Sequence, residues 1–481
     1  MNIKLLRCFM AALMVWMVSP NMAVAAAPLE DLERQLKDLQ TQIERLKQDK
    51  VEQDRRVREI ETAQKERAAK EAEAQQEQAK RREEQERKTV ILGEEMETLK
   101  SKITLPETIE YKSLYGLGPA ASKVYQMPRG LSIGGYGEAN ANFFVGDNEG
   151  PDKKRDVGDL ARFITYIGYK FSDRIILNSE IEYEHATTST TKSASSGSVS
   201  VEFLTLDFLL TERANIRAGL LLMPMGFINE MHEPTTYFGN LRPEVERRIL
   251  PSTWRELGVG LHGTILPGLT YRTYVTNSLN AKGFSKSDIR SSRQNGNRAL
   301  FEDFAWTTRL DYTPMPGLLL GGSVFWGDTG QDQLFAGKEI AANLRLYEFH
   351  GQYQYRGLQL RALFAQGHIS DADVLSTELK TPISRRIVGG YAEASYDILP
   401  LFFPGTDMSL SPFFRFERLN TQADVPSGFT PDRLQNTTVI NTGLSFKPIP
   451  NVVLKLDYRN MDGKGPGQIA DELNVGLGFI F

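Results

Sequence analysis

The segment that decides the fold is LNVGLGFIF, residues 473–481. Its apolar side chains alternate with Asn474, Gly476 and Gly478, so one face is apolar and the other is small or polar. Strict alternation predicts a β-strand with one face against an apolar phase. Because chain ends are usually frayed and polar, we expect a strand that finishes on Phe481 to be paired within a sheet.

The same period of two recurs in segments of about ten residues between positions 131 and 481. In ARFITYIGYKF, residues 161–171, apolar side chains alternate with Arg162 and Lys170. In VVLKLDYRN, residues 452–460, they alternate with Lys455, Asp457 and Arg459. A charged inner face with an apolar outer face is the reverse of a soluble barrel and is typical of strands that cross a membrane.

This division of faces places arginines on the inward side of several segments. The predicted lumen-lining residues are Arg162, Arg217, Arg272, Arg309, Arg361 and Arg415.

Counting the segments gives sixteen antiparallel strands, an even number, with short turns at one end and longer polar loops at the other. Outer-membrane barrels show this asymmetry, because their periplasmic turns are short and their outer loops are long. An even count returns both ends of the barrel to the periplasmic side. The strands are predicted near 131–145, 160–171, 174–186, 199–211, 214–223, 256–266, 268–277, 304–313, 317–327, 343–356, 358–369, 385–399, 407–419, 436–447, 451–460 and 471–481.

The chain before the barrel (131–481) divides into three predicted segments. Residues 1–26 have the basic start, apolar run and small-residue end of a secretory signal peptide, and they contain the only cysteine, Cys8. Residues 28–105 carry apolar side chains at steps of three and four, which predicts a long helical coiled coil. Its Ala/Glu/Gln-rich centre also fits a solitary charged helix or a disordered stretch. Residues 106–130 are a linker.

The alternative to a membrane barrel is a soluble all-β protein, whose repeated Arg and Glu are simply solvated. A mean hydropathy of -0.35 fits either class, because a barrel with alternating faces also averages to a polar value. Aromatic pairs at segment ends, such as Tyr353 with Tyr355, favour the membrane barrel, since they suit interfacial girdles. A net charge of -4 argues against a dedicated nucleic-acid binder.

The longest connection, from Pro224 to Arg255, is too apolar for a freely solvated loop. Loops of this kind are usually functional, so we predict that it folds into the lumen and narrows the pore. Its charges form a basic ring or a transverse field, which would set ion preference, unless each arginine pairs with a glutamate and stiffens the wall. The loop from Asn280 to Asp303 would add a basic mouth that includes Arg290 and Arg293. The predicted constriction residues are Arg242, Arg247, Arg248, Arg255, Glu233 and Glu244.

No catalytic, cofactor or metal site is predicted. The histidines are scattered without metal-ligand spacing, and HEP at 232–234 lacks the second histidine of a zinc-protease helix. There is no GxSxG motif. The chain is therefore predicted not to be an enzyme, with an outer-membrane Ser-His hydrolase as the remaining catalytic alternative.

Four stretches resemble the phosphate-selective porin O and P-like family. They are GGYGEANANFF (134–144), RFITYIGYKFSDRIILNSEIEYEHA (162–186), RAGLLLMPMGFINEMHEPTTYFGNLRPEVERRILPSTWRELGVGL (217–261) and IRSSRQ (289–294). The resemblance implies a sixteen-stranded outer-membrane channel, commonly trimeric. The end of the chain, with Phe479 and Phe481, resembles the signal that the barrel-insertion machinery reads, and the coiled coil resembles the periplasmic extension of related trimeric porins. A dense set of phosphate-trapping lysines is not matched.

The sequence thus predicts an outer-membrane porin for passive diffusion of small hydrophilic, anionic solutes of the phosphate or carboxylate type. The alternative is a structural barrel whose periplasmic coiled coil tethers the membrane to the cell wall. The expected partners are outer-membrane lipid, two further copies in a homotrimer through barrel and coiled coil, the insertion machinery and the cell wall, with no nucleic acid and no cofactor.

Overall fold

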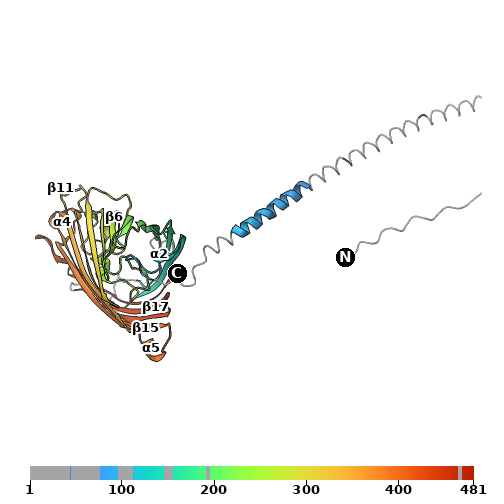
Figure 1. The fold of residues 1–481 in the computed structure, drawn as a ribbon. Coiled ribbons are helices and arrows are strands. Elements are labelled where there is room, and N and C mark those ends of the chain that lie inside the picture. Colours follow the sequence, from blue (N-terminus) through green and yellow to red (C-terminus); the bar gives the residue numbers. More distant parts are fainter. Residues whose placement is uncertain are drawn as a thin grey trace, which may run out of the picture. The chain divides into compact units, whose positions relative to one another are not determined.

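The computed structural model describes residues 44, 65, 76–95, 112–145, 155–190, 196–463 and 469–481. The chain divides into two units, Met1–Thr104 and Leu105–Phe481. In the first unit, residues 76–95 form a helix with an exposed surface (Figure 1). The predicted signal peptide and most of the predicted coiled coil lie outside the described residues, so both stay predictions, as does the tether that depends on them. None of the described helices is long and apolar enough to cross a membrane.

Within the described part of the second unit, sixteen antiparallel strands form one closed barrel, as the sequence predicts (Figure 1). A separate two-stranded sheet, β10 (Leu334–Phe335) with β11 (Lys338–Glu339), lies in a loop. The barrel strands are β1 (Gly130–Val145), β2 (Val157–Lys170), β3 (Ile175–Glu184), β4 (Ser198–Phe208), β5 (Asn215–Leu222), β6 (Arg255–Leu266), β7 (Leu269–Asn277), β8 (Phe304–Met315), β9 (Leu318–Gly327), β12 (Leu344–Tyr355), β13 (Leu358–Ile369), β14 (Arg386–Tyr396), β15 (Ser409–Asp424), β16 (Asn436–Ile449), β17 (Val452–Gly463) and β18 (Asp471–Ile480).

The final segment closes the barrel. β18 pairs with β1, with Tyr136 opposite Ile480. The backbone of Phe481 exchanges two hydrogen bonds with Gly135, at 2.9 and 3.0 Å, and its ring stacks on Phe163. Closure leaves no sheet edge whose amides would be unpaired in hydrocarbon.

The connections differ in length at the two ends of the barrel. At one end the turns are as short as two residues, and Gly268, Gly317 and Gly357 adopt the positive φ that such turns require. At this end the longest connection contains α5 (Leu399–Phe402). The opposite end carries the long loops, which include α4 (Ala372–Leu379) and the short 3₁₀ helices η1 (Ala281–Gly283), η2 (Arg290–Ser292) and η3 (Arg433–Gln435).

The two faces of each strand divide as the sequence predicts. In β17, Leu454 and Leu456 are exposed on the outside of the barrel, whereas Lys455, Asp457 and Arg459 are buried on the inside. The apolar outer surface fits a hydrocarbon environment. The closed barrel fits it as well, because only closed barrels and helices satisfy all of their backbone polar groups there.

The segment between β5 and β6, residues 223–254, lies inside the barrel; we call it the constriction loop. It contains α3 (Glu244–Arg248). Its backbone accepts hydrogen bonds from side chains of strands on different sides of the barrel. These include Arg309 of β8 to Gly226, Arg361 of β13 to Thr236, Arg415 of β15 to Phe238, Lys447 of β16 to Thr235 and Lys455 of β17 to Gly239. A segment that contacts so many strands around the barrel must cross the lumen, as predicted.

Part of the predicted linker is also packed inside the barrel. Residues 112–127 include α2 (Lys123–Gln126), which contacts β1, β2 and β3. Leu117, Ala120 and Ala121 lie in an apolar cluster with inward-facing wall residues, and small side chains allow this close approach. Residues 106–130 were predicted as a linker, and within that range residues 112–127 also help to fill the lumen.

Candidate pore constriction

A cavity of about 340 Å³ lies between the constriction loop and the barrel wall; we call it the arginine cavity. It is lined by side chains from β1, β2, β17, β18, the constriction loop and η2. Its charged lining residues are Arg162, Arg242, Arg247, Arg290, Arg459, Glu138, Glu244 and Glu472.

Each of the three carboxylates in this cavity already has a guanidinium partner. Glu138 contacts Arg162 at 2.7 Å, and Glu472 contacts Arg459 at 2.6 Å. Glu244 accepts from Arg247 at 2.6 Å and from Arg459 at 2.9 Å. Three of the five arginines in the lining, Arg162, Arg247 and Arg459, therefore neutralise its three carboxylates.

Arg242 and Arg290 carry the positive charge that is left. Arg242 is 8 % exposed, yet its Nε and NH2 atoms have no hydrogen-bond partner in the part of the chain that the structure describes. The NH1 atom of Arg290 is likewise buried without a partner among the described residues. A buried guanidinium without an acceptor is costly, so these donors fit an anion that enters from solution.

The pKa values of loop residues agree with an excess of positive charge. Burial, then repulsion from Arg293 and Arg247, lowers the pKa of Arg290 to about 9, so this side chain still carries its charge at pH 7. Burial acts to raise the pKa of Glu244, but the charges of Arg247 and Arg459 lower it to about 2. The pair-forming glutamate thus stays ionised while the unpaired arginine lacks a counter-charge.

Three of the six predicted constriction residues line this cavity, namely Arg242, Arg247 and Glu244. The other three have partners elsewhere. Arg248 donates to the carbonyl of Ser287 at 2.9 Å and to Gln435. Arg255 donates to Glu202 at 2.9 Å. Glu233 accepts from the backbone amides of Ala120 and Ala121, an arrangement that holds residues 112–127 against the constriction loop.

Of the six predicted lumen-lining arginines, only Arg162 lines the arginine cavity. The other five face inward but are buried with partners, so they stiffen the wall. They are Arg217 with Asp207 (2.7 Å), Arg272 with Glu230 (3.3 Å), Arg309 with Asp311 (2.8 Å), Arg361 with Gln352 (2.8 Å) and Arg415 with Glu417 (2.9 Å).

Three further residues line the cavity that were not predicted as site residues: Glu138, Arg459 and Glu472. Arg459 was placed on the inward face by the alternation in its strand. What the alternation could not indicate was which inward residues lie at the depth of the constriction loop. Arg290 was expected at an outer mouth, and η2 instead brings it to the cavity.

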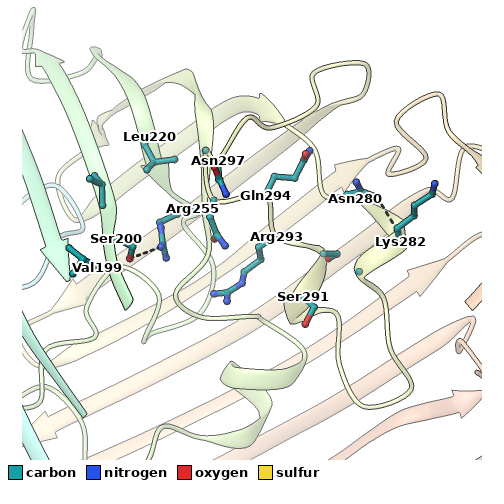
Figure 2. Close-up of a pocket in the computed structure, with 15 residues that line it drawn as sticks. Val199, Ser200, Leu220, Arg255, Asn280, Lys282, Ser291, Arg293, Gln294 and Asn297 are labelled. Carbon is teal, nitrogen blue, oxygen red and sulfur yellow. Dashed lines mark hydrogen bonds between the residues drawn. The ribbon is translucent and has the colours of Figure 1, made fainter. Parts of the chain in front are cut away.

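A second cavity, of about 800 Å³, lies beside the point where the chain leaves β5. Figure 2 shows Arg255 donating to Ser200 from one side, with Arg293 and Lys282 on the loop that follows β7. The guanidinium of Arg293 donates to the carbonyl of Thr253 at 2.6 Å. Because Arg255 is already ion-paired with Glu202 and Arg293 already donates to a backbone carbonyl, this cavity is a weaker candidate for anion binding than the arginine cavity.

Among the described residues, one group of three side chains converges at spacings suited to a metal ion: Glu180, Glu202 and His232. All three are buried. None of these three residues lines the arginine cavity.

No family model matches the chain. The Salmonella typhi OmpF complex with daunomycin is 13% identical, covers 74% of this chain and 98% of its own, and has a TM-score of 0.51, a likeness that shows the porin barrel fold. The anion-selective porin from Comamonas acidovorans is 10% identical with a TM-score of 0.46, over 73% of this chain and 99% of its own. An uncharacterized protein of Aquifex aeolicus (strain VF5) is 37% identical over 379 residues, which is 76% of this chain and 83% of the relative. The chain therefore belongs to the same family as this Aquifex aeolicus protein.

Proposed function

We propose that this protein is an outer-membrane channel through which small hydrophilic anions diffuse passively. The apolar outer face of the closed barrel supports a place in a membrane. The constriction loop across the lumen supports a narrow passage that limits the size of the solute, rather than a wide open pore. The resemblance of its sequence to phosphate-selective porins supports the same class of function, while the solute itself stays a prediction.

The observation that carries the proposal is the buried guanidinium of Arg242, which has no acceptor within the described residues. Arg290 adds a second uncompensated charge to the same cavity. Guanidinium groups bind carboxylate and phosphate oxygens in a bidentate manner. A basic lining of this kind favours anions and disfavours cations.

The size of the cavity limits the solute. A volume of about 340 Å³ holds about ten water molecules at the liquid value of about 30 Å³ each. This is room for an inorganic anion or a small carboxylic acid with part of its hydration shell. Larger solutes would have to displace the constriction loop, which is held by hydrogen bonds on many sides.

The direct test is to reconstitute the purified full chain in planar lipid bilayers and to measure the reversal potential in a potassium chloride gradient. We expect stable channels whose reversal potential has the sign of chloride preference. Absence of conductance, or a clear preference for potassium, would contradict the proposal.

We also propose that the channel is a homotrimer, because the apolar stripe predicted for residues 28–105 cannot be buried by one helix alone. Light scattering of the detergent-solubilised protein should give three times the mass of one chain. A monomer mass at all detergent concentrations would contradict this part.

A further inference from the structure

We propose that Glu180, Glu202 and His232 bind one divalent metal ion that ties the constriction loop to the barrel wall. Glu180 belongs to β3 and Glu202 to β4, whereas His232 belongs to the constriction loop. The mixed imidazole and carboxylate ligands suit Zn²⁺ or a neighbouring first-row ion. No metal site was predicted from the sequence, because the three ligands are far apart in the chain.

The distances between the ligand atoms fit a single ion. Nε2 of His232 lies 3.0 Å from Oε1 of Glu180 and 3.2 Å from Oε2 of Glu202. All three ligand atoms lie within 4.8 Å of one another. Tetrahedral ligands at the usual zinc distances of about 2.0–2.2 Å are separated by roughly 3.3 Å, so an ion can replace the proton between these atoms with little movement.

The surroundings hold two of the ligands in the orientation that a metal requires. Nδ1 of His232 lies 2.9 Å from the carbonyl oxygen of Asn229, so the proton belongs on Nδ1 and the Nε2 lone pair faces the carboxylates. Oε1 of Glu202 accepts from Thr253 at 2.6 Å and from Arg255 at 2.9 Å. This leaves Oε2 of Glu202 turned toward the imidazole.

Unpartnered atoms at the same place point to a missing ligand. Oε2 of Glu180 is fully buried and has no hydrogen-bond donor within the described residues. The ring of Tyr136 meets the His232 ring edge-on at 6.0 Å, and its buried hydroxyl also lacks a partner in the described chain. Buried polar atoms are normally satisfied, and a metal with one bound water would give the Glu180 oxygen an O–H donor and the Tyr136 hydroxyl a hydrogen-bond partner.

A divalent ion would also compensate a carboxylate that no arginine contacts. Arg255 pairs with Glu202, and Arg162 pairs with Glu138 and Glu182. Glu180 has His232 as its only ion-pair partner among the described residues.

The experiment uses the full-length protein, purified without chelator and dialysed against Zn²⁺ or Co²⁺ followed by metal-free buffer. Bound metal is measured by mass spectrometry, and the visible absorption of the Co²⁺ form reports its coordination. We expect one equivalent of metal and the intense Co²⁺ bands of a four-coordinate site. We also expect His232→Ala to lose at least nine-tenths of the metal.

A matched control is available in the same barrel. His350 is also buried between two carboxylates, but Asp311 contacts its Nε2 and Glu348 contacts its Nδ1. These carboxylates lie on opposite sides of the ring and cannot share one ion with it. His350→Ala should therefore retain the full equivalent of metal.

Two results would overturn the proposal. One is less than a tenth of an equivalent in the wild-type protein, which would leave a protonated His232 as the bridge between the carboxylates. The other is equal metal content in wild type and His232→Ala, which would mean adventitious binding. If His232→Ala fails to give the heat-resistant folded form on gels, Glu180→Gln serves instead, because it keeps the size of the side chain and should lower metal affinity at least tenfold.

Discussion

Replacement of Arg242 by glutamine should weaken anion preference, because this side chain supplies charge that no described carboxylate compensates. An anion about 4 Å from a guanidinium gains about 1 kcal/mol in bulk water and about 4 kcal/mol at an effective dielectric constant of 20. The side chain is 8 % exposed, so the aqueous value is a lower bound. A loss of about 1 kcal/mol corresponds to about a fivefold change in the ratio of anion to cation permeability.

The assay is the reversal potential of single channels in a salt gradient, from which the ratio of anion to cation permeability follows. We expect Arg242→Gln to lower this ratio about fivefold or more. Glutamine keeps hydrogen-bonding capacity and removes only the charge. High salt should reduce the difference between the two proteins, because it screens the charge.

Arg248→Gln is the matched control, because it removes the same charge from the same loop. Arg248 donates to Ser287 and Gln435 and does not line the arginine cavity. Its replacement should leave the permeability ratio within about twofold of wild type, a difference of less than about 0.5 kcal/mol. The reasoning would be refuted if both variants shifted the ratio equally, or if Arg242→Gln left it unchanged.

Three further predictions concern stability and the role of the N-terminal segment. Arg415→Met leaves Glu417 and Glu393 buried without their guanidinium partner, so the free energy of unfolding should fall by about 3–5 kcal/mol. The midpoint temperature of unfolding, followed by gel mobility, should fall accordingly, and an unchanged midpoint would contradict a buried ion pair. Burial raises the pKa of Glu233 from 4.5 to about 7. The contribution of its protonated form to the free energy of unfolding should therefore be complete below pH 4.5 and lost as the pH rises through 7. Glu233→Gln should reduce this pH dependence of stability, and an unfolding temperature of the wild type that does not change from pH 5 to 8 would refute the prediction. Deletion of residues 28–105 should leave single-channel conductance unchanged, because every lining residue of the arginine cavity belongs to the barrel unit; a lower conductance per barrel in the truncated protein would contradict this.

The architecture of the barrel could be predicted because it depends on a local pattern. A period of two fixes which side chains share a face, and this placed Leu454 outside and Arg459 inside before any strand pairing was known. The number of strands followed from the same alternation and from the lengths of the turns. Both predictions needed information from neighbouring residues only.

The members of the arginine cavity could not be predicted in the same way, because their partners are distant in the chain. Arg459 contacts Glu244 across 215 residues, and nothing in either local sequence indicates the other. Arg242 and Arg248 were both predicted as constriction residues, although only Arg242 lines the cavity. The difference arises from the path of the constriction loop through the lumen, and that path is set by contacts with many strands at once.

The packing of residues 112–127 inside the barrel was missed for a related reason. The stretch with Gly118, Ala120 and Ala121 has the small residues of a linker. Small residues also permit close packing against a wall, and here Gly118 lies so close to Glu233 that an added methyl group would force the carboxylate to move. Composition alone does not separate these two uses.

The most direct test of the central claim is to place a thiol at position 242 and to modify it while current flows. The only natural cysteine, Cys8, lies in the predicted signal peptide, so Arg242→Cys should be the single reactive site in the mature channel. If the arginine cavity is the conduction path, a negatively charged thiol reagent should lower the chloride conductance of this variant in discrete steps, one for each subunit modified. Complete labelling, verified by mass, with no change in conductance would show that ions pass elsewhere.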